Sequence, residues 1–260
     1  MIESKTMNDT RFMSTGIEKL DTLLEGGFQK GFTTLISGVP GSNLEIITKQ
    51  IATKEDVVYI STQETKDEIV STMQRFSWDT SHVDFVDIAS KHLHHILEGE
   101  TKRISIYEQR SKNKLKELIK TGSQGMPPSI RSQEDYLALI SHNARVNASK
   151  KIIVNSLDFF LNRYRHEDIL KALQAAKAIV SDKNGVLIII MTRGIHGEEI
   201  ERKLELLSDC VLELDVIQKG TTFERLLTVK KVRNYAKKIG TARYDITDTG
   251  FMLETIERIL

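Results

Sequence analysis

A short glycine-containing stretch has the spacing of a phosphate-binding loop. It follows an apolar run at residues 32–37, precedes a helical pattern at 46–52, and reads Gly38-Val39-Pro40-Gly41-Ser42-Asn43-Leu44-Glu45. In a working loop, G-x-x-x-x-G-K-[ST], backbone amides hold phosphate, the lysine contacts the terminal phosphates and the hydroxyl binds Mg²⁺. Asn43, Leu44 and Glu45 occupy the places of the second glycine, the lysine and the hydroxyl. The spacing is kept, but the side chains that would hold a nucleotide are absent.

Two residues of this loop also have the spacing of a helix capping box. Ser42-x-x-Glu45 predicts that the serine hydroxyl accepts a hydrogen bond from an amide of the following helix. Glu45 would place a negative charge in the first helical turn, where the helix dipole favours an anion. On this hypothesis the helix satisfies its own amides and the nucleotide site is closed.

The elements that position this loop are predicted from hydrophobic pattern. Continuous apolar runs rich in β-branched residues indicate strands buried on both faces of a parallel sheet. They cover residues 32–37, 57–61, 152–154 and 186–191, and helical patterns at 46–52, 67–76 and 167–181 lie between them. This alternation predicts an α/β fold with a mostly parallel central sheet, helices on both faces and right-handed crossovers.

The last third of the chain has a different pattern, typical of an antiparallel extension. Short strand candidates lie at 209–215, 224–233 and 243–246, with turns at Lys219-Gly220 and Thr249-Gly250. Residues 91–133 are predicted to be a less regular, partly basic insertion, an exposed helix followed by a flexible loop. Residues 1–260 otherwise read as one domain.

Composition excludes several classes of protein. The 260 residues carry 37 basic and 36 acidic side chains, a net charge of +1, so no global field attracts nucleic acid or an anionic membrane. The longest apolar run is about a third of the length of a membrane span. The single cysteine, Cys210, lies in an apolar run and is expected to be a buried structural thiol. We expect a cytoplasmic protein without a signal peptide.

The residues that lead into the loop resemble a known family. Residues 14–38 read STGIEKLDTLLEGGFQKGFTTLISG. This stretch is similar to the entry of the KaiC/RadA-like branch of the RecA superfamily, S/T-G-x-x-x-L-D-x-L-L-x-G-G-x-x-x-G-x-x-T-L-I-x-G, which runs into the Walker A loop. The resemblance extends more loosely over nearly the whole chain, and it implies a RecA-like P-loop NTPase fold.

Three further segments resemble motifs of the same family. YISTQE at 59–64 looks like the strand that ends in paired catalytic acids, with Gln63 replacing the first and Glu64 kept. KIIVNSL at 151–157 looks like the Walker B strand, with Asn155 in place of its aspartate. RLLTVKKVRN at 225–234 resembles the strand whose lysine and arginine reach a neighbour's nucleotide, which makes Lys231 and Arg233 interface candidates.

These replacements remove most of the groups that bind and activate ATP, because phosphoryl transfer depends on positioning and charge stabilisation. Each lost charge-assisted hydrogen bond is worth about 1.5–3 kcal/mol. A carboxylate such as Glu45 at about 4 Å from a phosphate oxygen repels it by about 4 kcal/mol at an effective dielectric constant of about 20. Mg²⁺ could bridge the two, but Asn155 supplies no companion carboxylate. We therefore expect no cofactor, and ATP with Mg²⁺ is disfavoured.

Four functions remain as hypotheses. The first is a non-hydrolysing pseudo-ATPase that acts as a protein- or peptide-binding scaffold or regulatory subunit, alone or in oligomers with RecA-like subunits. The second is a nucleotide-binding sensor that uses Gly38, Gly41 and Glu64. The third is a weak ATPase in which Lys49 or Lys231 replaces the lost lysine, although Lys49 is expected to face away from the loop. The fourth, a DNA recombination or repair paralogue, rests only on the basic segment 102–120.

Three other features have plainer interpretations. The histidines of His92-Leu93-His94-His95 would lie on different helix faces without companion ligands, so no metal site is expected. The basic segment 102–120 is interleaved with glutamates and is expected to be a solvated helix face, which makes nucleic-acid binding unlikely as its role. Arg193 and His196 follow a predicted strand at its carboxyl end, where α/β sheets bind ligands, and they are candidates for a ligand other than a nucleotide.

Overall fold

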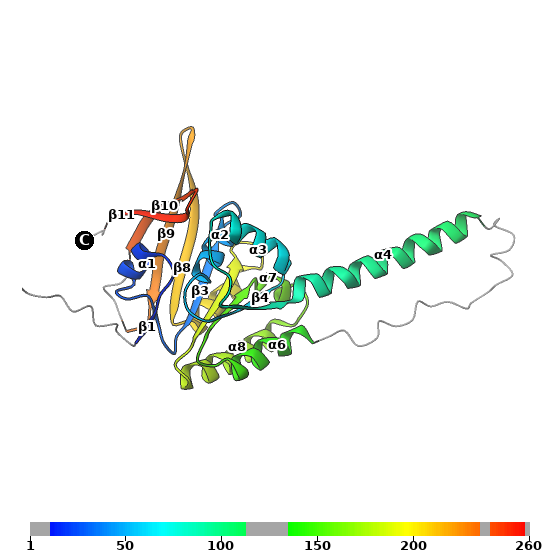
Figure 1. The fold of residues 1–260 in the computed structure, drawn as a ribbon, viewed down its shortest axis with the longest axis horizontal. Coiled ribbons are helices and arrows are strands. Elements are labelled where there is room, and N and C mark those ends of the chain that lie inside the picture. The colour runs from blue at the N-terminus through cyan, green and yellow to red at the C-terminus, as the bar shows by residue number, and fades with distance from the viewer. Residues whose placement is uncertain (1–10, 113–134, 235–239, 258–260) are drawn as a thin grey trace, which may run out of the picture.

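The computed structural model describes residues 11–112, 135–234 and 240–257. Its centre is a nine-stranded sheet in the order β11-β10-β9-β8-β3-β7-β6-β4-β5 (Figure 1). The six strands from β8 to β5 are mutually parallel, and β9, β10 and β11 are antiparallel. The predicted fold class, a mostly parallel α/β sheet with an antiparallel C-terminal extension, is confirmed.

The central strands are buried because their apolar residues point to both faces of the sheet. β3 (Thr33–Gly38), β4 (Val57–Ser61) and β6 (Lys151–Asn155) are buried throughout, and β7 (Val186–Thr192) is buried except at its last residue. All four were predicted to within one residue at either end. β5 (Val83–Asp87) forms one edge, and its single fully buried residue explains why its pattern gave no strand prediction.

The prediction for residues 209–215 was only partly right. β8 (Cys210–Lys219) pairs antiparallel with β9 (Thr222–Val232), as expected for a meander. On its other side it pairs in parallel with β3, so it belongs to the parallel sheet as well. The β8–β9 hairpin extends beyond the body of the sheet, and β10 (Gly240–Thr247) and β11 (Gly250–Glu257) follow β9 (Figure 1).

Helices and one hairpin cover the two faces of the sheet. One core cluster contains apolar residues of α1 (Glu18–Leu23), α2 (Leu44–Ile51), α3 (Lys66–Arg75) and the β10–β11 hairpin. The other contains residues of α6 (Tyr136–Val146), α7 (Asp158–Leu161), α8 (His166–Asp182) and α9 (Glu198–Leu207). A small separate sheet of β1 (Phe12–Met13) and β2 (Phe28–Gln29) lies before β3.

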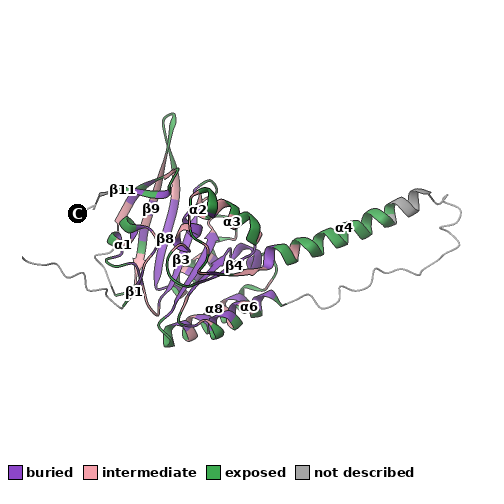
Figure 2. Ribbon diagram, viewed as in Figure 1, coloured by how far each residue is buried: buried purple, intermediate pink, exposed green. Residues whose placement is uncertain are grey.

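The predicted insertion contains a long helix. α4 (Ile88–Lys112) projects from the body and is exposed along most of its length (Figure 2). The flexible loop predicted after it lies in 113–134, outside the described residues. Within the described part of the chain, no helix combines the length and apolar character that crossing a bilayer requires.

A buried lysine joins the end of α2 to the N-terminal segment. Lys151 is 0% exposed, and its Nζ donates to the carbonyl oxygens of Ser14 at 2.8 Å, Ile51 at 3.1 Å and Lys54 at 3.0 Å. Burial lowers the pKa of Lys151 to about 8, although Glu55 partly opposes the shift. The ammonium therefore satisfies carbonyls that α2 leaves open at its C-terminal end.

This lysine predicts a specific pH dependence of stability. Between pH 8 and its unfolded value of 10.5, the unfolded chain binds more protons at Lys151 than the folded chain does. The free energy of unfolding should therefore rise with pH in this window, by about 1.4 kcal/mol per pH unit from this group. Urea unfolding of the wild type and of Lys151→Met at several pH values measures it. The wild type should gain stability relative to the variant above pH 8, and a constant difference would contradict the shift.

Candidate functional site

The loops that follow the parallel strands meet at one edge of the sheet. Gly38 at the end of β3 pairs with Thr192 at the end of β7, and Ser61 at the end of β4 pairs with Asn155 at the end of β6. The segments that continue from these four residues carry the predicted site residues. The carboxyl edge of a parallel sheet is where α/β folds bind ligands, so we take it as the candidate site.

The loop between β3 and α2 keeps an unusual backbone conformation. Gly41 has φ of 85°, and Asn43 has φ of 56° and ψ of 38°, the left-handed region. Asparagine adopts this region more readily than most residues, and Asn43 stands where the motif requires glycine. The replacement at position 43 therefore leaves the loop backbone able to turn into α2.

The predicted capping box is wrong. The N-cap of α2 is Asn43, not Ser42, and it makes no side-chain capping hydrogen bond. The left-handed φ of Asn43 differs from the extended backbone that a capping box requires at the N-cap. Ser42 is 1% exposed, and its Oγ has no hydrogen-bond partner in the described structure. This oxygen lies close to Gly38, where an added Cβ would come within 2.4 Å of it. Glu45 does lie in the first turn of α2, exposed, as predicted.

The amides of the loop are only partly used. The Ser42 amide donates to the Val39 carbonyl at 3.1 Å, and the Ser42 carbonyl accepts from the Tyr244 hydroxyl at 2.5 Å. Within the described residues, the amides of Gly41 and Leu44 have no such acceptor. A left-handed turn with open amides ahead of a helix is a geometry that can hold an anion. The hypothesis that the helix closes the site with its own hydroxyl is therefore not supported by the hydrogen bonds.

An ion pair joins a buried lysine of α2 to a half-buried glutamate that follows β4. The Nζ of Lys49 lies 2.6 Å and 2.9 Å from the two carboxylate oxygens of Glu64, and the Lys49 side chain is 1% exposed. The same Nζ donates to the Glu45 carbonyl at 3.3 Å. The expectation that Lys49 faces away from the loop is wrong, because helical side chains lean toward the N-terminal end of their helix. The one acid kept from the predicted pair is thus neutralised by an internal cation.

Asn155 is held by a neighbouring phenol. Its Nδ2 donates to the Tyr59 hydroxyl oxygen at 2.6 Å, and both residues are buried. Burial, reinforced by the charge of Glu64, raises the pKa of Tyr59 far above its usual value, so the phenol stays neutral. The polar groups at the end of β6, the Asn155 amide and the Tyr59 phenol, are therefore both neutral.

Sequence reasoning missed a buried carboxylate at the start of α7. Asp158 is 3% exposed and accepts hydrogen bonds from the Thr192 amide at 3.0 Å and hydroxyl at 2.7 Å. His196 Nε2 lies 2.8 Å from its Oδ1, and Gln63 Nε2 lies 3.5 Å from its Oδ2. His196 had been singled out, but nothing in the sequence paired it with an aspartate 38 positions earlier. Asp158 holds the loop after β7 against the end of β6.

Arg193 is also paired within the chain. Its guanidinium contacts the carboxylates of Glu213, at 3.1 Å, and Asp215, both on β8. Its amide donates to the Gly38 carbonyl at 2.9 Å, which fixes this residue beside the loop. Arg193 therefore reaches the candidate site with its charge already neutralised.

The interface candidates Lys231 and Arg233 lie away from this loop. Lys231 Nζ donates to the carbonyls of Glu205 at 2.9 Å and Ser208 at 2.7 Å, at the C-terminal end of α9. Burial lowers its pKa. Arg233 lies 2.9 Å from Asp209 and over the ring of Phe32. Both cations have partners inside the chain, and their role at an interface stays a prediction.

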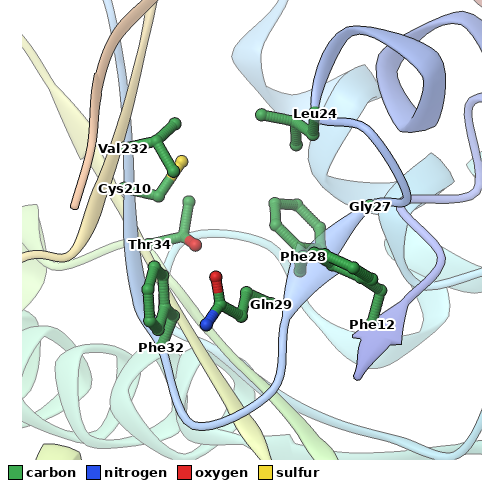
Figure 3. A pocket seen from close by; sticks show the side chains of 9 residues that line it. All are labelled: Phe12, Leu24, Gly27, Phe28, Gln29, Phe32, Thr34, Cys210 and Val232. Carbon is green, nitrogen blue, oxygen red and sulfur yellow. The ribbon is translucent and has the colours of Figure 1, made fainter. Parts of the chain in front are cut away.

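Two cavities lie elsewhere. One of about 10 Å³ separates the β1–β2 sheet from the main sheet and is lined by Phe12, Leu24, Gly27, Phe28, Gln29, Phe32, Thr34, Cys210 and Val232 (Figure 3). That volume admits a single water molecule, and Cys210 is buried there as predicted. The other, of about 270 Å³, is lined by residues 13, 30, 55, 56, 149 and 150. Residues 38–45 line neither.

Comparisons with known proteins identify the family of the chain. The sequence model of the family described as "ATPase: KaiC" matches residues 13–257. The chain belongs to the KaiC family. Among relatives of the chain, a UPF0273 protein of Thermotoga maritima is 23% identical over 248 residues, covering 93% of this chain and 95% of its own. A UPF0273 protein of Pyrococcus horikoshii is 22% identical, covering 94% of each chain.

The fold of a solved structure is also similar. The crystal structure of a KaiC-like protein from Pyrococcus horikoshii superposes with a TM-score of 0.65 at 18% identity. The match covers 94% of this chain and 98% of that one. The similarity therefore covers the whole fold, including the antiparallel extension. Because a shared fold does not define a functional site, the site is interpreted from this chain's own residues.

Proposed function

We propose that this KaiC-family chain does not hydrolyse ATP and acts as a protein-binding scaffold or regulatory subunit. The observation that carries the proposal is the pairing of cations at the carboxyl edge. Lys49 is bound to Glu64, and Arg193 is bound to Glu213 and Asp215. No unpaired cation is left among these groups to receive a triphosphate.

The identity of the loop residues supports the same proposal. Leu44 offers no charge, and Glu45 is an exposed carboxylate in the first turn of α2. Asn155 is engaged with Tyr59, and Gln63 reaches toward Asp158, so neither supplies a ligand for Mg²⁺. These are the degenerate counterparts of the Walker A, Walker B and catalytic-acid positions. The residues at these positions offer phosphoryl transfer no lysine on the loop, no Walker B carboxylate for Mg²⁺ and no unpaired base.

A second candidate is a nucleotide-binding sensor without hydrolysis. The left-handed backbone at Gly41 and Asn43 and the open amides of the loop favour it, because such a turn can hold phosphate without side chains. The weak ATPase with Lys49 as the replacement lysine loses support from the contact with Glu64, which occupies that ammonium.

Steady-state phosphate release tests the loss of hydrolysis. The wild type should release phosphate from ATP with Mg²⁺ at the rate of a buffer blank, and Glu64→Gln should not change that rate. Release that depends on Glu64 would show an active enzyme and overturn the proposal. Asn155→Ala is a matched control, because it alters the same edge without touching the Glu64 carboxylate.

A further inference from the structure

The helix α4 contacts the body of the protein through residues near its N-terminal end. Ile88 and Ala89 are buried, and His92 packs against the ring of Phe159. Residues 93–105 and Tyr107 are exposed (Figure 2). Its 25 residues correspond to about 38 Å of helix, so most of it stands free of the domain (Figure 1).

This projecting helix carries a single apolar face. Leu93, Ile96, Leu97, Ile104 and Tyr107 are between 46% and 74% exposed. At about 100° per residue they fall within about 100° of one another around the helix. The steps from 93 to 97, to 104 and to 107 follow a repeat of about 3.5 residues, the period of two helices packed side by side. A contiguous apolar stripe of this kind marks an interaction surface.

A pair of charges at the middle of the stripe indicates what covers it. Glu100 lies on the apolar face, and Arg103 lies at its margin, 2.6 Å from the Glu100 carboxylate. When an identical helix runs antiparallel across this point, each glutamate meets the partner's arginine. A parallel copy would instead place Glu100 beside Glu100 and Arg103 beside Arg103, and like charges at a helix interface repel.

The apolar residues have the same two-fold arrangement. Leu93, Ile96 and Leu97 precede the charged pair along the helix and Ile104 and Tyr107 follow it, with Ile96 and Tyr107 equally far from the pair. An antiparallel crossing therefore brings the first group of one copy against the second group of the other. This self-complementarity is what an isologous two-fold interface requires.

We propose that α4 is a dimerisation helix that pairs antiparallel with α4 of a second copy of this chain, with the Glu100–Arg103 pair at the crossing point. The seam spans about two heptads, so the dimer should be weak and concentration-dependent. The interface is remote from the loop at residues 38–45. The proposed dimer is therefore independent of the proposed function and of whether nucleotide binds.

The test measures the mass of the full chain by sedimentation equilibrium without nucleotide, from about 1 to about 200 µM, a range that brackets micromolar dissociation constants. The wild type should pass from 29.5 kDa to twice that mass. Leu97→Glu/Ile104→Glu should raise the dissociation constant at least ~10-fold. His95→Glu/Ser105→Glu adds the same charge on the opposite face and should leave it unchanged. Because these positions are exposed, none of the variants should affect folding.

A charge exchange tests whether Glu100 and Arg103 lie in the interface. Glu100→Arg should weaken the dimer, and the double variant Glu100→Arg/Arg103→Glu should restore it, because an antiparallel pair again joins opposite charges. A wild type that stays monomeric at all concentrations, an assembly whose mass Leu97→Glu/Ile104→Glu leaves unchanged, or a charge exchange without restoration would each overturn the proposal.

Discussion

Leu44→Lys/Glu45→Thr should bind ATP with Mg²⁺ at least ~100-fold more tightly than the wild type. The lysine adds charge-assisted hydrogen bonds to phosphate of about 1.5–3 kcal/mol each. Loss of the Glu45 carboxylate removes a repulsion of up to about 4 kcal/mol for each phosphate charge at about 4 Å. Asn43 needs no change, because its backbone is already left-handed. Isothermal titration compares the two proteins, and about 1.4 kcal/mol corresponds to each tenfold gain.

The control for this gain is Leu44→Met/Glu45→Gln, which removes the carboxylate without adding a cation. It should recover only the part of the affinity that Glu45 opposes. If the lysine-bearing variant binds no better than this control, the loop backbone does not hold phosphate. The hypothesis of a nucleotide-binding sensor would then fail. The explanation that the replaced side chains cause the loss of ATP binding would fail with it.

Glu64→Gln should destabilise the fold more than Lys49→Met does, although both variants break the same ion pair. Removing Glu64 leaves the ammonium of Lys49, 1% exposed, without its carboxylate. Breaking a fully buried pair costs about 3–5 kcal/mol, so a loss near the lower end of that range is expected for this half-buried pair. Glu64 is 32% exposed and can turn to water when Lys49 is lost. Methionine fills most of the lysine's volume, so that change should cost about 1.5 kcal/mol or less.

Urea unfolding of the three proteins measures this asymmetry through the midpoint and slope of each transition. Asp67→Asn, in the first turn of α3, is a suitable reference because it removes an exposed charge near the same end of the sheet. Equal losses from Glu64→Gln and Lys49→Met would mean that the lysine can reach solvent. The pairing would then offer no argument that the site is closed to phosphate.

The sheet was predictable because its central strands are buried on both faces. Residues 186–191 are apolar without interruption, and such a run has few alternatives in an α/β protein. β5 and α9 were not predicted. β5 lies at an edge, where only Val83 is fully buried, and α9 is mostly charged with a narrow apolar face.

The site was predictable in its residue types but not in its contacts. The positions of Leu44 and Glu45 follow from the spacing of the loop, and that of Asn155 follows from the resemblance of its strand to the Walker B strand. The partner of Lys49 does not, because only the fold brings Glu64, 15 positions later, within 2.6 Å of the lysine Nζ. The spacing of Ser42 and Glu45 predicted that Ser42 caps the helix. The N-cap is instead Asn43, one residue later, because Asn43 has a left-handed φ that the local sequence pattern does not predict.

Isothermal titration of the wild-type chain with ATP and Mg²⁺ tests the central claim most directly. The paired cations and the Glu45 carboxylate predict no saturable heat at ATP concentrations up to about 1 mM, where binding free energies weaker than about 4 kcal/mol stay undetected. A saturating isotherm with a micromolar dissociation constant would contradict the claim, because it would show that the loop holds a triphosphate without a lysine.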